Sequence, residues 1–478
     1  MSGRQSRFES SDDVVVMKFG GSSVEDAEAI RRLISTVQGC QGCQRVIVVS
    51  ALGGVTDQLL EAGKAAANGR LGLALELVRR IYVRHERLAE ELVGGGADLE
   101  LERELRAEFQ RLEALLLELN APQEFDLKAR DHLLGIGERL SSLLIAAAMS
   151  HAEIRATHVD AAACVVTDSR HGQANPLWDV TNQRLQAALG PLLESGRVPV
   201  LGGFIASTLE AVPTTLGRGG SDFTATIVGA ALSAARIEIW TDVDGVMTTD
   251  PKLCAEARVI RKISFDEAAE LAYFGAKVLH PATLAPVVRE GIPVYVRNSR
   301  NPQAEGTEIA ARARTGNAVS AITAKRNVAA VEVESALEVS NMLHLVYAAF
   351  DRHGCPVDVM ATSFGQMSLL VRATEALPQI AAELKDVANV RWENHRALVC
   401  LVGEKVRRHP DVASRAFATV ADMDVRVVCQ GASDRTISFL VHESKVEESV
   451  QRLHAVFFPR REAAADWGGI STAFCHAG

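Results

Sequence analysis

Several short segments place charged or hydroxyl side chains beside glycines, a combination suited to binding anions. The first is KFGGSS at residues 18–23, where Lys18 comes near the end of an apolar run and Gly20 and Gly21 follow it. Glycines let backbone amides approach an anion closely, and a following helix adds positive potential. A lysine there can stabilise the charge of a phosphoryl group in transfer. A turn whose lysine reaches into solvent explains this segment alone equally well.

The segment TTLGRGGSD at residues 214–222 surrounds a guanidinium group with three glycines. Arg218 can hold a carboxylate through two parallel hydrogen bonds, and Asp222 can receive an ammonium group. We expect Ser221 to cap the apolar helix that follows. The alternative interpretation is a flexible loop in front of a capped helix, with no ligand.

Three further segments carry charges at positions where ligands could bind. WTDVDGVMTTDP at residues 240–251 follows a predicted strand, and ligands of parallel sheets bind at the carboxyl ends of strands, although turns rich in Asp and Gly are common. Lys277 in FGAKVLHP is either a phosphate ligand or a solvated helix residue. Glu138 lies at the start of an apolar helix, where it either satisfies the helix dipole or holds a substrate amine.

An alternation of strands and helices must position these segments. Apolar runs at residues 14–19, 45–51, 158–167, 198–205, 235–243 and 292–298 predict buried strands, and the stretches after the first two predict a glycine turn and then a helix. This order is typical of an α/β fold with a mostly parallel sheet. Residues 59–119 instead show long amphipathic helices, including one over residues 99–119, whose leucines indicate a packing face.

Polar, breaker-rich sequence at residues 299–307 and 311–317 predicts a domain boundary. Beyond it the pattern β-α-β-β-α occurs twice, which indicates an internal repeat of a ferredoxin-like unit. The last strand of the unit is clear only in the first round, at VRWENH. The tail, residues 460–478, shows no clear element.

Composition narrows the class of protein. The 478 residues correspond to about three domains, and the net charge of −9 argues against a general nucleic-acid binder. No stretch approaches the roughly 18 apolar residues that span a bilayer, and the polar N-terminus lacks the apolar core of a signal peptide, so we expect no membrane contact and a cytoplasmic protein. Of eight cysteines, only Cys40 and Cys43 form a CxxC pair, which without a second pair is a weak metal signal.

The motifs VMKFGGSSV, TTLGRGGSD, IWTDVDGVMTTDP and FGAKVLHPAT, in this order and spacing, resemble aspartokinase of the amino-acid kinase superfamily. The resemblance covers about residues 14–459 and is nearest to the single-function, lysine-sensitive type with two C-terminal ACT domains. It implies a catalytic domain over residues 12–312 and ferredoxin-like (βαββαβ) ACT domains over 325–399 and 400–460. It further implies transfer of the ATP γ-phosphoryl group, with Mg²⁺, to the β-carboxylate of L-aspartate, giving 4-phospho-L-aspartate. That is the first step towards lysine, threonine and methionine, and the family implies an amino-acid effector and a homodimer or larger assembly.

The resemblance also assigns roles to individual residues. It implies catalytic roles for Lys18, Asp222 and Lys277. The implied aspartate site comprises Ser50, Thr56, Glu138, Phe204, Arg218, Ser221 and Asp222. The implied ATP site comprises Lys18, Gly20, Gly21, Thr241, Asp242, Met247, Lys252 and Lys277. The implied effector site comprises Val357, Asp358 and Ser363. No metal ligand is assigned.

Departures from the family pattern leave the effector open. Met247 stands where the family often has tyrosine, and Phe364 where the lysine-sensitive type has glutamate; Ala336 and Val339 occupy its effector loop. Two other functions compete with an aspartate kinase. A catalytically weak amino-acid sensor would not need the charged site of Lys18, Arg218, Asp222 and Lys277. A glutamate or N-acetylglutamate kinase of the same fold fits less well with the two ACT-like units.

Overall fold

The computed structural model describes residues 13–40, 42–94, 98–120, 125–276, 279, 281–313, 317–430 and 433–459. Contacts divide the chain into two compact units. The first comprises Met1–Met247 and Arg258–Ser320, and the second comprises Thr248–Ala257 and Ala321–Gly478. Residues 248–257, which the sequence places in the predicted catalytic domain, therefore have most of their contacts with the second unit.

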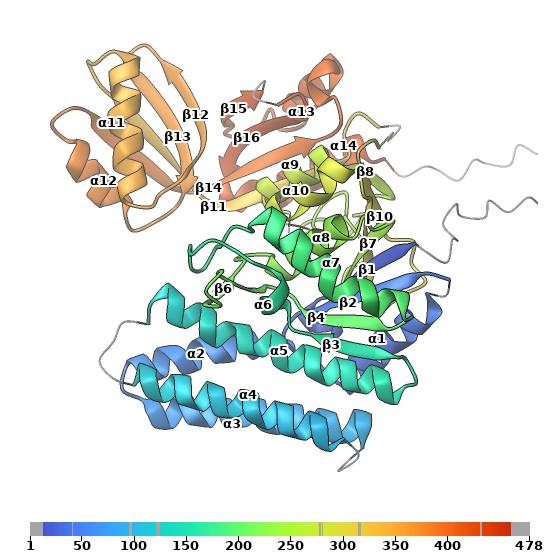
Figure 1. Cartoon of the computed structure of the whole chain (residues 1–478). Coiled ribbons are helices and arrows are strands. Elements are labelled where there is room, and N and C mark those ends of the chain that lie inside the picture. Colours follow the sequence, from blue (N-terminus) through green and yellow to red (C-terminus); the bar gives the residue numbers. More distant parts are fainter. Residues whose placement is uncertain are drawn as a thin grey trace, which may run out of the picture. The chain divides into compact units, whose positions relative to one another are not determined.

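The first unit is built on an eight-stranded sheet, as the apolar runs predict (Figure 1). Its strands are β1 (Val14–Phe19), β2 (Gln44–Val49), β3 (Ala156–Val159), β4 (Val198–Gly202), β7 (Arg236–Thr241), β8 (Lys262–Ser264), β9 (Val294–Asn298) and β10 (Thr307–Ala310). Their order is β3-β4-β2-β1-β7-β9-β10-β8. From β3 to β9 all neighbours are parallel, so six strands end at the same edge. Strands β5 (Ile205–Ser207) and β6 (Pro213–Thr215) form a separate hairpin.

Helices cover both faces of this sheet. They are α1 (Ala27–Gly39), α2 (Val55–Ala67), α3 (Leu71–Val93), α4 (Leu99–Leu119), α5 (Leu127–His151), α6 (Ala161–Cys164), α7 (Trp178–Glu194), α8 (Gly220–Ala231), α9 (Phe265–Tyr273) and α10 (Pro281–Glu290), with the 3-10 turn η1 (Gly21–Ser23). One hydrophobic core joins α1–α5 to alternate residues of β1, namely Val15, Met17 and Phe19. Helix α8 packs on β1 and β7 and also contacts α7 and α10. Helices α3 and α4 form an outer layer against α2 and α5 (Figure 1).

Helix α5 is longer and more apolar than we expected of any segment from the sequence. By length and composition alone it could cross a membrane, so the expectation that no stretch approaches this length was wrong. In the structure 83% of its apolar window is buried within the fold. The helix is apolar nearly all round because it is packed between α2 and α4 and the sheet, which is the situation of a central core helix.

Two predicted strands of the first unit are shorter than their apolar runs. The run at residues 158–167 was wrongly read as one strand: β3 ends at Val159, and Asp160 starts α6 by accepting a hydrogen bond from the Ala162 amide (3.1 Å). The run at residues 198–205 is broken between β4 and β5, where Phe204 adopts a left-handed conformation (φ 66°). An Asp or a positive φ ends a strand that hydrophobicity alone would continue.

The second unit is a six-stranded antiparallel sheet with helices. Its elements are β11 (Ala321–Glu334), α11 (Val339–Arg352), β12 (Val357–Ser363), β13 (Gln366–Arg372), α12 (Leu377–Leu384), β14 (Asn389–Val402), η2 (Val406–Arg408), α13 (Pro410–Thr419), β15 (Arg426–Gln430), β16 (Thr436–His442), η3 (Glu443–Lys445) and α14 (Val446–Phe457). The strand order is β12-β13-β11-β14-β16-β15. Both predicted β-α-β-β-α rounds are present, and the α/β fold class with ferredoxin-like units is confirmed.

The last strand of the second repeat is supplied by a segment that precedes the first repeat in the sequence. Strand β11 is 14 residues long, and its first half pairs with the second half of β14, from Ala321 opposite Val402 to Lys325 opposite Leu398. Its second half, from Val328 onwards, pairs with β13 and with the first half of β14. Each repeat is therefore a complete βαββαβ unit, and residues 321–324, outside both predicted ACT ranges, complete the second.

Candidate active site

The carboxyl edge of the first unit's sheet has a point where the strand order reverses. From β1 the chain continues through α1 to β2 on one side, whereas β7 and β9 lie on the other side. Ligands of open α/β sheets bind at such a point. Lys18 lies near the carboxyl end of β1, and Thr241 is the last residue of β7, directly beside it in the sheet order. Two motifs that are far apart in the sequence thus meet at one edge.

Lys18 and Asp222 form a buried ion pair at this edge. Because strand side chains alternate, Met17 and Phe19 enter the α1–α5 core and Lys18 points to the opposite face, which α8 covers. Asp222 lies in the first turn of α8, and its Oδ1 is 2.6 Å from the Lys18 ammonium. Two of the three predicted catalytic residues are thus brought together, and Lys18 is only 8% exposed.

The Gly20-Gly21 turn is held against the end of β7. The Gly20 amide donates to the Trp240 carbonyl (3.1 Å), and the Ser23 hydroxyl donates to Ser299 Oγ (2.8 Å). A side chain at Gly21 would place its Cβ 3.2 Å from the Ala51 carbonyl oxygen, so the turn needs glycine to approach the loop after β2. The turn therefore lies between the ends of β7 and β2, as an anion-binding loop requires.

The other residues assigned to ATP do not all lie at this edge of the sheet. The Thr241 hydroxyl donates to Asp242 (3.2 Å), which is exposed at the end of β7. Met247 is half-buried and bridges to Val259 in the same unit. Lys252 belongs to the second unit, and Lys277 lies outside the described residues. Only Thr241 and Asp242 of this group are thus placed at the edge beside Lys18.

Glu138 is a buried carboxylate with an unused oxygen. It lies on α5, is 4% exposed, and among the described residues no donor reaches its Oε2. Burial raises the pKa of this carboxyl to about 8, and a hydrogen bond from the Ala51 backbone opposes only part of that shift. An unpaired buried carboxyl is costly, so Glu138 is suited to receive a cationic group of a ligand.

Two consecutive glycines bring Glu138 and α8 to the end of β4. A Cβ at Gly202 would lie 2.9 Å from the Glu138 carbonyl oxygen, and a Cβ at Gly203 would lie 2.6 Å from Ser221 Cβ. Any larger residue would push α5 or α8 away from the edge. These glycines were not among the predicted site residues, although the pair GG directly after an apolar run was a usable signal.

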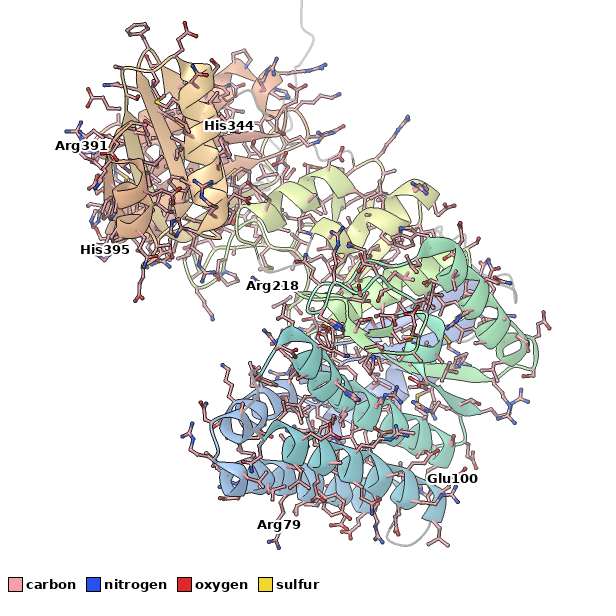
Figure 2. All side chains as sticks on the ribbon, turned by 60° about the vertical axis from the view of Figure 1, so that its left-hand side comes forward. Arg79, Glu100, Arg218, His344, Arg391 and His395 are labelled. Atoms are coloured by element: carbon pink, nitrogen blue, oxygen red, sulfur yellow. The ribbon has the colours of Figure 1, made fainter. Side chains whose placement is uncertain are left out.

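Phe204, Ser221 and Arg218 lie around this point. The Phe204 amide donates to Thr224 Oγ1 of α8 (2.9 Å), and its carbonyl accepts from the Leu216 amide (2.9 Å). The prediction that Ser221 caps α8 was wrong, because the N-cap is Gly219 in a left-handed conformation (φ 72°) and Ser221 is already in the first turn. Arg218 is exposed on the loop before α8 (Figure 2).

Ser50 and Thr56 belong to the loop that faces the glycine turn. The Ser50 amide donates to the Phe19 carbonyl (3.1 Å), and Thr56 is in the first turn of α2. Arg84 of α3 ties this loop to the segment after β1, because its guanidinium donates to the carbonyls of Gly53 (2.7 Å) and Glu25 (2.6 Å). Arg84 was missed, since one arginine in an amphipathic helix looks like any solvated residue.

Asp131 is a second residue near the site whose contacts the sequence did not reveal. It is 1% exposed and lies two turns before Glu138 on α5. Its carboxylate accepts hydrogen bonds from His171 Nδ1 (2.9 Å), the Gly172 amide (2.9 Å) and the Thr215 hydroxyl. Thr215 comes three residues before Arg218, so Asp131 fixes the base of the loop that carries the guanidinium.

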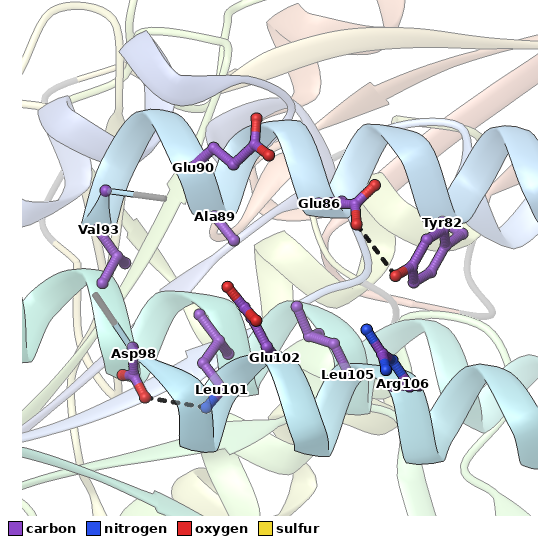
Figure 3. A pocket seen from close by; sticks show the side chains of 11 residues that line it. Tyr82, Glu86, Ala89, Glu90, Val93, Asp98, Leu101, Glu102, Leu105 and Arg106 are labelled. Carbon is purple, nitrogen blue, oxygen red and sulfur yellow. Dashed lines mark hydrogen bonds between the residues drawn. The ribbon is translucent and has the colours of Figure 1, made fainter. Parts of the chain in front are cut away.

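No cluster of three His, Cys, Asp or Glu side chains that could hold a metal ion occurs within the described ranges. The residues present therefore fit Mg²⁺ only as it usually binds at nucleotide sites, where phosphates and one or two carboxylates hold the ion. A separate hollow between α3 and α4 is lined by acidic side chains and Tyr82 (Figure 3). It lies in the outer helical layer and shares no residue with the site at the sheet edge.

The residues assigned to an effector lie together on β12 of the second unit. Val357 and Ser363 are the first and last residues of this strand, and the Asp358 carboxylate is 2.7 Å from the Lys325 ammonium of β11. Phe364, directly after the strand, is fully exposed. The acidic group that would meet an amino-acid effector thus already interacts with a lysine of this chain.

Comparisons with known proteins agree on one family. Residues 13–298 match the Amino acid kinase family, and residues 399–457 match the ACT domain. Lysine-sensitive aspartokinase 3 of Escherichia coli is 34% identical over 463 residues, covering 93% of this chain and 99% of that protein. Aspartokinase 3, chloroplastic, of Arabidopsis thaliana is 35% identical over 461 residues, covering 93% and 81%. The crystal structure of E. coli aspartokinase III with aspartate and ADP superposes with a TM-score of 0.82 at 32% identity, covering 93% of this chain and all of that one.

Proposed function

Because this chain belongs to the aspartokinase family, we propose how its own residues perform the reaction of that family. The chain is an ATP-dependent aspartate kinase that catalyses the first step of the aspartate pathway. A β-carboxylate oxygen of L-aspartate forms a bond to the γ-phosphorus, the bond to the β,γ-bridging oxygen breaks, and ADP leaves. The attacking carboxylate is already ionised near pH 7, so no general base is needed.

Lys18 is the central residue of this proposal. Two anions must meet, so a fixed cation beside the transferring phosphoryl group has the largest effect on the barrier. Asp222, 2.6 Å from the Lys18 ammonium, holds that cation in one orientation. ATP is placed along the Gly20-Gly21 turn and Thr241-Asp242, at the point where the strand order reverses, and Mg²⁺ supplies charge neutralisation on the phosphates when bound.

The aspartate site is placed between α5 and the loop before α8. Glu138 receives the ammonium group, and its unpaired, buried Oε2 is the single observation that carries this assignment. Arg218 clamps the α-carboxylate, and Ser221, Phe204, Ser50 and Thr56 surround the substrate. The β-carboxylate then points towards Lys18, because Ser221 and Asp222 are adjacent in the first turn of α8.

The reaction is tested by measuring ADP release and by trapping the acyl phosphate with hydroxylamine. With ATP, Mg²⁺ and L-aspartate both signals are expected, and both should vanish when Mg²⁺ is chelated. L-Glutamate and N-acetylglutamate serve as competing acceptors. Turnover of glutamate without turnover of aspartate would contradict the proposal and favour another kinase of the same fold. Absence of turnover with every acceptor would favour a sensor.

Replacing Arg218 by alanine is expected to raise the KM for aspartate about 10- to 50-fold, with a smaller change in kcat. The lost interaction is a pair of charge-assisted hydrogen bonds, weakened by the exposure of this side chain to solvent. Initial rates at varied aspartate and at varied ATP separate the effects. Arg218→Lys is the matched control and should recover only part, because an ammonium cannot form the bidentate contact. An effect confined to the KM for ATP would reassign Arg218.

Replacing Asp131 by asparagine is expected to raise the KM for aspartate about 5- to 10-fold while kcat and the KM for ATP stay nearly constant. Asparagine cannot accept at both oxygens, so the loop bearing Arg218 loses one of its attachments to α5. Asp126→Asn is the control, because Asp126 caps the same helix without touching that loop. Equal KM changes in the two variants would show that Asp131 acts only through the stability of α5.

An amino-acid effector at the two ACT units is a further part of the proposal. The E. coli relative is named lysine-sensitive, and residues 399–457 match the ACT domain. In this chain Asp358 is paired with Lys325, and Phe364 replaces a glutamate of the lysine-sensitive pattern, so the effector site on β12 differs from that type. Activity measured with L-lysine, L-threonine and L-methionine, singly and in pairs, identifies the effector.

The assembly and the location of the protein complete the proposal. Strands β12 and β15 are the last strands on either side of the second unit's sheet and contact each other. Because ACT-like units leave strand edges that a second copy can cover, we expect a homodimer or larger homo-oligomer. Light scattering of the intact chain measures its mass. We place the enzyme in the cytoplasm, which cell fractionation tests; the Arabidopsis relative is named chloroplastic.

A further inference from the structure

Two thiols lie in contact at the amino edge of the first unit's sheet. Cys40 is the C-cap of α1, and Cys43 directly precedes β2. Their sulfur atoms are 2.7 Å apart and share a hydrogen bond. The amino edge is the edge opposite Lys18 and Thr241, about 20 Å away for a strand of six residues. The pair therefore takes no part in the kinase site.

A fixed positive charge faces this pair. The Arg236 guanidinium, at the start of β7, donates to Cys40 Sγ (3.7 Å) and is held by Glu238 (2.8 Å). Glu238 in turn accepts from the Trp240 indole (3.1 Å), since residues 236, 238 and 240 lie on the same face of β7. The hydrogen bond to Glu238 thus holds the Arg236 side chain along the strand and fixes its position beside the sulfur atoms.

The two thiols differ in acidity. The hydrogen bond from Cys40 lowers the pKa of Cys43 to about 7, and the charges of Arg236 and Arg45 add to this, whereas burial and Glu238 oppose it. The pKa of Cys40 is raised, first by its hydrogen bond with Cys43 and then by burial. A nucleophilic thiolate beside a protonated thiol is the arrangement of a dithiol that exchanges with disulfides.

A metal site and a purely structural role explain the pair less well. Within the described ranges no third His, Cys, Asp or Glu completes a metal site with these thiols. Structural cysteines are usually buried, as Cys164, Cys254, Cys355 and Cys400 are here, whereas Cys40 and Cys43 are half-buried and lie at the margin of the core. Their partial exposure leaves the pair accessible to a small oxidant.

We propose that Cys40 and Cys43 are a thiol–disulfide exchange site that reacts with small-molecule disulfides. The Cys43 thiolate attacks one sulfur of the oxidant, forming a mixed disulfide and releasing one thiolate. Cys40 loses its proton and attacks Cys43 Sγ, which forms the Cys40–Cys43 bond and releases the second thiolate. The two electrons and the two cysteine protons end on the oxidant as two thiols, and an excess of thiol reverses both steps.

The test uses the full chain and oxidised glutathione, followed by trypsin and mass spectrometry. The tryptic peptide 33–45 contains both cysteines and no other. It is expected to lose two hydrogen masses, to resist alkylation by iodoacetamide, and to return to its original mass with dithiothreitol. Retention of two alkylatable thiols, or a stable glutathione adduct with no internal disulfide, would overturn the proposal.

Two variants separate exchange from simple exposure. In Cys43→Ser the loss of two hydrogens should disappear, whereas in the control Cys429→Ser, a half-buried cysteine of the second unit, it should persist. In Cys40→Ala, which has no donor at this position, the pH at which Cys43 is half-alkylated should move upward from about 7, because the hydrogen bond that favours its thiolate is gone. An unchanged midpoint would show that the two thiols do not cooperate. These measurements do not depend on the kinase activity, so a negative result would contradict the exchange site without contradicting the proposed function.

Discussion

Replacing Lys18 by alanine is expected to lower kcat about a thousandfold and to change the KM values for ATP and aspartate only a few-fold. In the proposed mechanism the ammonium group lies beside the phosphoryl group where negative charge develops, and removing one preorganised group of this kind typically costs a factor of about 10²–10³. Steady-state rates with both substrates varied measure the effect. An unchanged kcat would remove Lys18 from the mechanism.

The ion pair with Asp222 complicates this variant and also provides its control. Removing one partner of a buried pair leaves an uncompensated charge and can cost about 3–5 kcal/mol of stability. Asp222 is 2.6 Å from the Lys18 ammonium, so Lys18→Ala should unfold at a lower temperature than the natural chain. In the double variant Lys18→Met with Asp222→Asn no buried charge is left. Its melting temperature should recover while kcat stays low, which assigns the loss of turnover to the missing cation.

Replacing Glu138 by glutamine is expected to lower kcat/KM for aspartate about 100-fold at pH 8 and to change its pH dependence. In the free enzyme the pKa of Glu138 is about 8, so the carboxyl is protonated below that pH and charged above it. Only the charged form pairs with the substrate ammonium, so kcat/KM of the natural chain should rise with pH up to about 8. Glu138→Gln should lack this rise, because its amide does not titrate.

The control for this experiment is Glu108→Gln. Glu108 is a second buried carboxylate, on α4, paired with Arg111 (2.9 Å) and outside the proposed aspartate site. This variant should keep both the KM for aspartate and the rise with pH. A rise that persists in Glu138→Gln would assign the titration to another group.

Stability should change in the opposite direction to activity. The folded-state pKa of Glu138, about 8, lies above its ordinary value of 4.5, so the unfolded chain releases this proton first. Stability therefore falls as pH rises from about 4.5 to 8, and the full cost is present above 8. Glu138→Gln removes that cost, on the order of 5 kcal/mol at most. Its melting temperature should exceed that of the natural chain at pH 8 but not at pH 4, which thermal unfolding at both pH values measures.

Much of the fold could be predicted because the relevant signals are local. The apolar run of β1 and the amphipathic helix α4 have the limits that periodicity predicts, and the β-α-β-β-α rounds are present. The strand expected at residues 158–167 failed for a local reason as well. Asp160 can accept a hydrogen bond from a helix amide, and this competes with continuation of the strand.

The candidate site was predicted where a chemical group and a glycine turn are neighbours in the chain. Lys18 with Gly20 and Gly21, and Arg218 with Asp222, stand out in one short segment each. Asp131 and Arg84 did not, because each acts on a loop that is distant in the sequence and looks unremarkable within its own helix. A single sequence reports which side chains are apolar or charged, but not which of them meet.

By itself, the sequence determined the α/β class, the family and the chemistry of the motifs, because these depend on residue types and short spacings. Only the tertiary structure decided which groups share a site. It paired Lys18 of β1 with Asp222 of α8, left Glu138 buried with an unused oxygen, and completed the second ACT-like repeat with the first half of β11. The physical reason is that strand pairing and burial are long-range: backbone hydrogen bonds and low-dielectric surroundings come from segments many residues away, and no local pattern encodes them.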